Sequence, residues 1–264
     1  MAKEKTIISW PQSGRTWLIT MIGKIFADYY NEYDLATKFS SYGFGRDINN
    51  LGEYNLHTFP REHENQAWLK TSKQLDIDKT TCKDMYGKGN EIPSKNIDCI
   101  FLVRDPIDTL KSNYQRRIKI KNSSTNFRGT SSKFIRSNKG SLKSMIKWLN
   151  IWSDNFNKFN SYIVVKYENL HNNCFNQMRQ VIDFIGYNNI PDDYIQKAID
   201  FGNIKNMRKI EQKEGNKNHI MFGKDIKFVN DGKMNVGVDF FDKRDVKYIE
   251  KYVKQLSPVY GYKV

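Results

Sequence analysis

The sequence predicts an α/β protein in which a central, mostly parallel β-sheet lies between two layers of helices. Short, uninterrupted apolar runs, of which residues 99–103 are the clearest, are typical of strands buried on both faces of a parallel sheet. These runs alternate along the chain with apolar residues at helical spacing. The first run also leads through a tight Ser-Gly turn into a helix, as in phosphate-binding loops. Because 264 residues suit one large core, we expect a three-layer sandwich built as a single domain, residues 1–264.

Continuous apolar runs mark the expected strands. The first run is closed by Pro11, which restricts the residue before it to extended conformations. Strands that alternate with helices pair in parallel through right-handed crossovers. The expected strands are residues 6–10, 67–71, 99–103 and 162–167.

Apolar residues at helical spacing, together with end signals, mark the expected helices. Pro106 suits a first turn, Gly186 suits a helix end, and the carboxylates of Asp242 and Asp245 suit a helix start. The expected helices begin at residue 16 and cover residues 106–114, 142–159, 178–185 and 242–256. Residues 31–66 show no clear pattern, and the polar stretch 121–140 is predicted to be a mobile loop.

The composition excludes several classes of protein. Hydrophobic residues at 39% and aromatic residues at 14% exclude a disordered chain. No window approaches the roughly 18 apolar residues of a membrane helix, and the charged start at residues 1–5 lacks the pattern of a signal peptide. The three cysteines (Cys82, Cys99 and Cys174) are odd in number and lack metal-ligand spacing, so we expect thiols in a reducing, cytoplasmic location and no metal site. The net charge of +14 is compatible with nucleic acid, an acidic membrane or a phosphorylated small ligand.

A candidate phosphate loop follows the first strand at residues 11–17. Backbone N–H groups in such a turn point at one spot, and the start of the helix adds partial positive charge. Gly14 permits close backbone approach, while Arg15 and the hydroxyl of Thr16 add donors, so the expected ligand is an anion. The spacing of nucleoside triphosphatases is not met, because Ser9 stands where their first glycine would be and Arg15 where their lysine would be.

Several stretches, in order and in register, resemble the PAPS-dependent sulfotransferase family. The first is the loop pattern Pro-x-Ser-Gly-x-Thr-Trp after the first strand. A strand-end Val-Arg-Asp-Pro with a serine eight positions after the arginine, a Tyr-Glu-x-Leu segment and an Asn-Met-Arg-Lys segment follow it. The matching stretches are residues 11–17, 103–106 with Ser112, 165–170, 206–209 and 231–233.

The resemblance implies a P-loop-like sulfotransferase fold that binds 3′-phosphoadenosine 5′-phosphosulfate (PAPS) and releases adenosine 3′,5′-bisphosphate (PAP). By this resemblance, Arg104 and Ser112 bind the 3′-phosphate, whereas an ion pair of Arg104 with Asp105 or Asp108 is the structural alternative. Trp17, Tyr167 and Met207 lie on the adenine side, and each of them could equally be core. The implied donor-binding residues are Gln12, Ser13, Gly14, Arg15, Thr16, Trp17, Arg104, Ser112, Tyr167, Met207, Gly232 and Lys233.

The sequence departs from the family at two reacting positions. Gln12 stands where the family has a lysine on the bridging oxygen, and Arg15 in the same loop could restore that positive charge. Ser72 stands where the family has a histidine that accepts the proton of the acceptor, and a serine hydroxyl is a poor base. We expect His57 to act as the base, with His63, Glu62 or Glu64 as alternatives. Lys70 matches the family lysine that contacts the sulfuryl group, so the expected catalytic residues are Lys70, His57 and Arg15.

The expected acceptor is a small, partly apolar molecule with a hydroxyl or an amine, because many aromatic residues lie within 31–66. Two other functions remain open at this stage. A P-loop-type kinase is disfavoured, because no Walker lysine and no clear aspartate-based magnesium site is present. A non-catalytic binder of nucleotides or nucleic acid would fit Gln12, Ser72 and the charge. Segments such as residues 116–119, however, lack the interleaved aromatics of a nucleic-acid binder.

Overall fold

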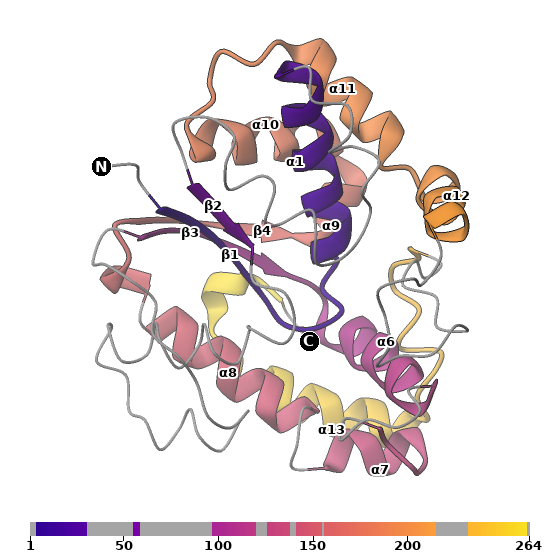
Figure 1. Ribbon diagram of the computed structural model, residues 1–264. Helices are drawn as coiled ribbons and strands as arrows, with labels where there is room; N and C mark the ends of the chain where they lie inside the picture. The colour runs from indigo at the N-terminus through magenta and orange to yellow at the C-terminus, as the bar shows by residue number, and fades with distance from the viewer. Residues whose placement is uncertain are drawn as a thin grey trace.

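The protein contains a parallel β-sheet with helices on both faces, as the computed structural model shows (Figure 1). The strand order is β2-β1-β3-β4, and all three pairings are parallel. The strands are β1 (Glu4–Ser9), β2 (Asn55–Thr58), β3 (Ile97–Val103) and β4 (Ser161–Lys166). The structure describes residues 4–30, 55–58, 97–119, 126–137, 141–154, 156–214 and 232–262.

The helices cover the sheet in two groups, one on each face (Figure 1). On one face lie α1 (Arg15–Tyr29), α10 (Cys174–Ile185) and α11 (Asp192–Phe201). On the other face lie α6 (Pro106–Lys119), α7 (Ser131–Arg136), α8 (Leu142–Asp154) and α13 (Lys243–Val253). The remaining described elements are α9 (Tyr167–Asn172), α12 (Ile204–Glu214) and the 3₁₀ turns η2 (Phe156–Lys158) and η3 (Pro258–Tyr260).

Alternation along the strands divides the core into two clusters. Ile100 and Leu102 of β3 pack with α1, α10 and α11, while Phe101 and Val103 of the same strand pack with α6, α8 and α13. Successive side chains of a strand point to opposite faces, so a continuous apolar run fills both helical layers. The predicted three-layer α/β sandwich is therefore confirmed.

The strand register brings the carboxyl ends of three strands to one edge. Ser9 at the end of β1 pairs with Leu102, and Val103 at the end of β3 pairs with Lys166 at the end of β4. The residues that follow these strands, namely the 10–14 loop, Arg104 and Tyr167, therefore share this edge. In open α/β sheets, ligands bind outside the carboxyl ends of the strands.

Two predicted helix ends are confirmed by their hydrogen bonds. The side chain of Asp242 accepts a hydrogen bond from the backbone N–H of Asp245 (2.8 Å), so it caps the start of α13. Gly186 ends α10 with a φ of 107° and donates to the carbonyls of Ile182 and Asp183. The helix predicted at residues 106–114 is also present, and α6 continues to Lys119.

The prediction of a mobile loop at 121–140 is wrong for residues 131–136, which form α7. The hydroxyl of Thr130 accepts a hydrogen bond from the N–H of Lys133 and caps this helix. Phe134 and Ile135 are fully buried, and the ring of Phe134 contacts Tyr114 and Phe127. Two apolar residues are too few to show a helical period, so only their packing identifies this element.

The prediction of a buried strand at 162–167 is also wrong in part. β4 ends at Lys166, Tyr167 begins α9, and the side chain of Tyr162 is 40% exposed. β4 stands last in the described strand order, where one side of the strand has less cover. The strand predicted at 67–71 lies outside the described residues, and β2 lies within the stretch to which no element was assigned.

Candidate active site

The candidate phosphate loop connects β1 to α1 at the shared edge of the sheet. Gly14 occupies the N-cap position of α1 with a φ of 93°, and Gln12 has a φ of 74°. A positive φ in a non-glycine residue is a strained conformation that often occurs at functional sites. No described side chain caps α1, and no acidic residue lies in its first turn. The start of α1 therefore keeps its partial positive charge and its N–H donors for an external anion.

The ring of Tyr167 lies directly on the phosphate loop. A Cβ atom at Gly14 would lie 2.4 Å from Cδ2 of Tyr167, well inside van der Waals contact. Glycine is thus required at this position both by its backbone conformation and by the neighbouring ring. The contact joins two segments that lie about 150 positions apart in the sequence.

The guanidinium of Arg104 joins the parts of the site. Its Nη1 atom makes long hydrogen bonds to the carbonyl of Gln12 (3.4 Å) and to Oγ of Ser112 (3.5 Å), and its Nη2 atom donates to the carbonyl of Lys233 (3.0 Å). The guanidinium lies 4.3 Å from the centre of the Tyr167 ring. The Nε atom is buried and has no hydrogen-bond partner among the described residues.

Buried donors in proteins are nearly always paired, so these weak and missing bonds indicate an acceptor that is supplied by a ligand. The ion pair that was the structural alternative is also present, because Nη2 of Arg104 lies 3.6 Å from Oδ2 of Asp108. Arg104 can form this ion pair and bind a ligand at the same time, since a guanidinium carries five N–H donors.

Arg15 contributes a second, partly desolvated cation. Burial and the neighbouring charge of Arg116 lower the pKa of Arg15 to about 10. At neutral pH the side chain still carries its proton, so it acts as a cation and not as a base. Two guanidinium groups close enough to repel each other favour the binding of an anion between or beside them.

An aromatic cluster that includes Tyr167 lies next to the loop. The ring of Trp17 contacts the rings of Tyr167 (centroids 5.7 Å apart) and His171 (4.8 Å), and its Nε1 atom donates to the carbonyl of Gly202 (2.8 Å). A Cβ atom on Gly232 would lie 4.0 Å from the hydroxyl of Tyr167. These contacts form an aromatic surface suited to a planar base, next to the cationic part of the site.

Sequence reasoning assigned no role to two residues here, His171 and Glu168. Burial and the charge of Arg104 lower the pKa of His171, which favours the neutral ring. Glu168 accepts hydrogen bonds from the N–H of Asp105 (2.8 Å) and the hydroxyl of Tyr262 (2.9 Å), so it ties the starts of α9 and α6 to the last described residues. Glu168 lies two positions and His171 five positions after Lys166, the end of β4. This place after a strand end, and for Glu168 the Tyr-Glu-x-Leu segment, are the signals in the sequence that could have found them.

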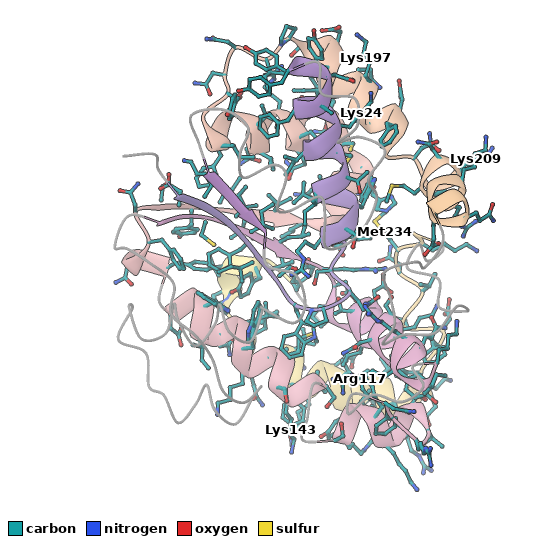
Figure 2. The ribbon with its side chains drawn as sticks, viewed as in Figure 1. Lys24, Arg117, Lys143, Lys197, Lys209 and Met234 are labelled. Carbon is teal, nitrogen blue, oxygen red and sulfur yellow. The ribbon has the colours of Figure 1, made fainter. Side chains whose placement is uncertain are left out.

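The structure thus brings most of the predicted donor-binding residues to one edge. Those at or next to the site are Gln12, Ser13, Gly14, Arg15, Thr16, Trp17, Arg104, Ser112, Tyr167, Gly232 and Lys233. Met207 is buried on α12, whose first residue, Ile204, contacts Gly232. In Figure 2, Met234 of the segment after Gly232 is labelled near the start of α1.

The predicted catalytic residues are only partly described. His57 lies on β2, where it pairs with Thr6 of β1, and no contact of its side chain is described. Lys70, Ser72 and the alternatives His63, Glu62 and Glu64 lie outside the described residues, as do the aromatics expected to form the acceptor pocket. Within the described ranges, no helix is both long and apolar enough to cross a membrane, and no three histidine, cysteine or acidic side chains are grouped to hold a metal ion.

A parallel sheet with an uncapped helix start, a buried arginine and an aromatic cluster at its carboxyl edge is the arrangement in which α/β proteins hold phosphorylated ligands. The sequence matches the family model of the sulfotransferase domain over residues 3–257, so the chain belongs to the sulfotransferase family. No curated protein matches it.

Solved structures show the same fold. Mouse sulfotransferase SULT7A1 complexed with PAP has a TM-score of 0.62 and 15% sequence identity, with 98% of this chain and 87% of that chain covered. Retinol dehydratase in a complex with retinol and PAP has a TM-score of 0.58 and 14% identity, with 96% and 81% covered. The same enzyme with androsterone and PAP has a TM-score of 0.53 and 14% identity, with 95% and 79% covered.

Proposed function

We propose that this sulfotransferase transfers the sulfuryl group of PAPS to a hydroxyl or amine of a small, partly apolar acceptor. The observation that carries the proposal is the buried guanidinium of Arg104, which lies between the phosphate loop, Ser112 and Lys233. Its Nε–H has no acceptor in the part of the chain that the structure describes. A ligand phosphate at this point would satisfy that donor. The similar structures contain PAP, and two of them contain retinol or androsterone, which supports the choice of donor and of acceptor class.

The residues at the edge of the sheet fit the parts of the proposed donor. The start of α1, which no described side chain caps, and the loop residues Gln12 to Thr16 would hold the 5′ side, with Arg15 in the first turn of the helix. Arg104 and Ser112, with Lys233 beside them, would hold the 3′-phosphate. Trp17 and Tyr167 offer the aromatic surface for adenine, with Met207 on the adjacent helix.

When bound, the donor supplies a sulfuryl group on an activated phosphate. The proposed task of Arg15 is to stabilise the negative charge that develops on the leaving phosphate. Lys70 would contact the sulfuryl oxygens, and His57 would accept the proton of the acceptor. The buried, rigid setting of Arg104 and Tyr167 would orient the nucleotide, so that the reacting groups meet in line.

The distribution of charge does not favour a nucleic-acid binder. Figure 2 shows Lys197 of α11 and Lys143 of α8 at opposite ends of the molecule, with Lys209 projecting from α12 at the side. These three lysines thus lie on different parts of the molecule, whereas binding of a nucleic acid favours one basic stripe.

The proposed donor predicts a strong preference for PAP over AMP. These nucleotides differ by the 3′-phosphate, and one bidentate charged contact is worth about 1.5–3 kcal/mol, so PAP should bind roughly 10-fold more tightly or better. Isothermal titration calorimetry on the wild-type protein checks this preference. Equal affinities of the protein for PAP and AMP would contradict the proposed function.

We expect Arg15 to provide the positive charge with which the phosphate loop stabilises the leaving group. Replacing Arg15 with alanine should slow sulfuryl transfer under saturating donor, because Gln12 offers hydrogen bonds but no charge. The change Gln12→Lys should leave the rate of sulfuryl transfer unchanged or increase it, since it adds a cation. Lysine and glutamine are both non-glycine residues, so the positive φ at position 12 strains the backbone to the same extent in the variant and in the wild type. The initial rates of both variants are measured. If Arg15→Ala turns over as fast as the wild type, Lys70 and not Arg15 stabilises the leaving phosphate.

A further inference from the structure

A single buried carboxylate, Asp108 of α6, joins two parts of the candidate donor site. The side chain of Asp108 is 1% exposed. Its Oδ1 atom accepts hydrogen bonds from the N–H groups of Val236 (3.0 Å) and Gly237 (2.7 Å), and its Oδ2 atom accepts one from Asn235 (2.9 Å). Oδ2 also lies 3.6 Å from Nη2 of Arg104. Three successive backbone donors and one cation thus converge on one side chain.

The segment 232–237 is held against α6 by further contacts. Arg104 donates to the carbonyl of Lys233, and Nζ of Lys111 donates to the carbonyl of Val236 (3.2 Å). A Cβ atom at Gly237 would lie 2.7 Å from the carbonyl carbon of Ile107, so the two backbones are in direct contact. Asn235 has a φ of 57°, which turns consecutive N–H groups toward the same point. The segment therefore takes its shape from the first two turns of α6.

The charge of Asp108 opposes the direct binding of a phosphate. A negative group next to Arg104 reduces the attraction of this guanidinium for a phosphate. If the only task of the site were to concentrate positive charge, this carboxylate would weaken it. Its contacts instead locate two groups that approach the ligand from different parts of the chain, Arg104 after β3 and Gly232–Lys233 before α13. Placement of ligand-binding groups depends on neighbours that fix their orientation.

We propose that Asp108 is the positioning residue that sets the specificity for a 3′-phosphorylated nucleotide. It does so by holding the guanidinium of Arg104 and the segment 232–237 in one arrangement. The proposal rests on the proposed function, because it assigns the 3′-phosphate to this part of the site. Asp108 itself does not touch the nucleotide, and its effect passes through Arg104 and the backbone of the segment.

The test compares the affinities of Asp108→Asn for PAP and AMP by calorimetry. Asparagine has the same size, but its amide nitrogen cannot accept an N–H, so at least one of the three backbone bonds is lost. The affinity for PAP should fall at least about 10-fold and that for AMP less than about 3-fold, so the preference collapses. Hydrogen exchange should also accelerate at the amides of residues 235–237, while the amides of β3 keep their protection.

Asp245→Asn provides a matched control. Asp245 is also a buried carboxylate (2% exposed) that accepts hydrogen bonds from Ser132 and Arg136, but it lies on α13, away from the phosphate loop. This variant should lose thermal stability and keep the preference for PAP. Asp108→Glu retains the charge but displaces it by one methylene, so it should keep the fold and show an intermediate preference.

The outcomes separate the inference from the proposed function. A wild-type protein without a preference for PAP would overturn the proposed function. A wild-type preference that survives unchanged in both Asp108 variants, even with faster exchange at 235–237, would show that Asp108 is only structural. A collapse of the preference in Asp108→Asn, with the preference of Asp245→Asn intact, supports the positioning role.

Discussion

Replacement of Arg104 with alanine is expected to abolish the preference for PAP over AMP. The guanidinium makes its contacts from a buried position, where it lies over the ring of Tyr167 at 4.3 Å, and its Nε donor has no acceptor among the residues that the structure describes. The bidentate charged contact is worth about 1.5–3 kcal/mol, so its loss should weaken PAP binding by roughly 10-fold or more, which removes the preference. AMP lacks the 3′-phosphate, and its affinity should change little. Calorimetry with both nucleotides gives the ratio.

The loss of Arg104 also leaves the buried carboxylate of Asp108 without its cation, so the variant should be less stable. Two further variants separate this effect from ligand recognition. Arg136→Ala removes an arginine that likewise lies over a tyrosine ring (Tyr248, 4.4 Å) and pairs with a buried aspartate, and it should keep the nucleotide preference. Arg104→Lys keeps the positive charge but loses the planar guanidinium with its paired N–H donors, so it should retain only part of the affinity for PAP. An Arg104→Ala variant that still prefers PAP would place the 3′-phosphate elsewhere.

Replacement of His57 with alanine is expected to lower kcat by at least about 100-fold, because general base catalysis typically contributes 10²–10⁴-fold. His57 is the third residue of β2, which runs parallel to β1, with Thr58 opposite Ile7. Parallel neighbours end at the same edge of a sheet, so β2 leads toward the edge that carries the phosphate loop. The donor affinity should change little, because no donor contact is assigned to this residue.

The pH dependence and a neighbouring variant test this assignment. An imidazole has an unperturbed pKa of about 6.5, so wild-type activity should fall on acidification as the base becomes protonated. The residual activity of His57→Ala should not show this decrease at acidic pH. Thr58→Ala alters the same strand without removing a proton acceptor, and its kcat should stay close to that of the wild type. A full kcat in His57→Ala would pass the role to His63, Glu62 or Glu64.

Local sequence patterns predicted the elements that are marked by residues close together in the sequence. The apolar run of β3, the Asp242 cap of α13 and the glycine that ends α10 were all confirmed. The phosphate loop belongs to the same group, because its strand, its positive-φ glycine and its helix are consecutive. In contrast, α7 escaped prediction, since its two buried residues acquire their partners from α6 and from the residues just before it.

The sequence by itself determined the fold class, the sulfotransferase resemblance and the positions of Gly14, Arg104 and Ser112, because these features are encoded by period, turn chemistry and short motifs. The tertiary structure decided which groups meet. The ring of Tyr167 comes to rest on Gly14, the carboxylate of Asp108 accepts three N–H groups from residues 235–237, and His171 packs on Trp17. No pattern in the sequence encodes these contacts. Each depends on the parallel register of β1, β3 and β4, which brings the ends of three distant strands to one edge.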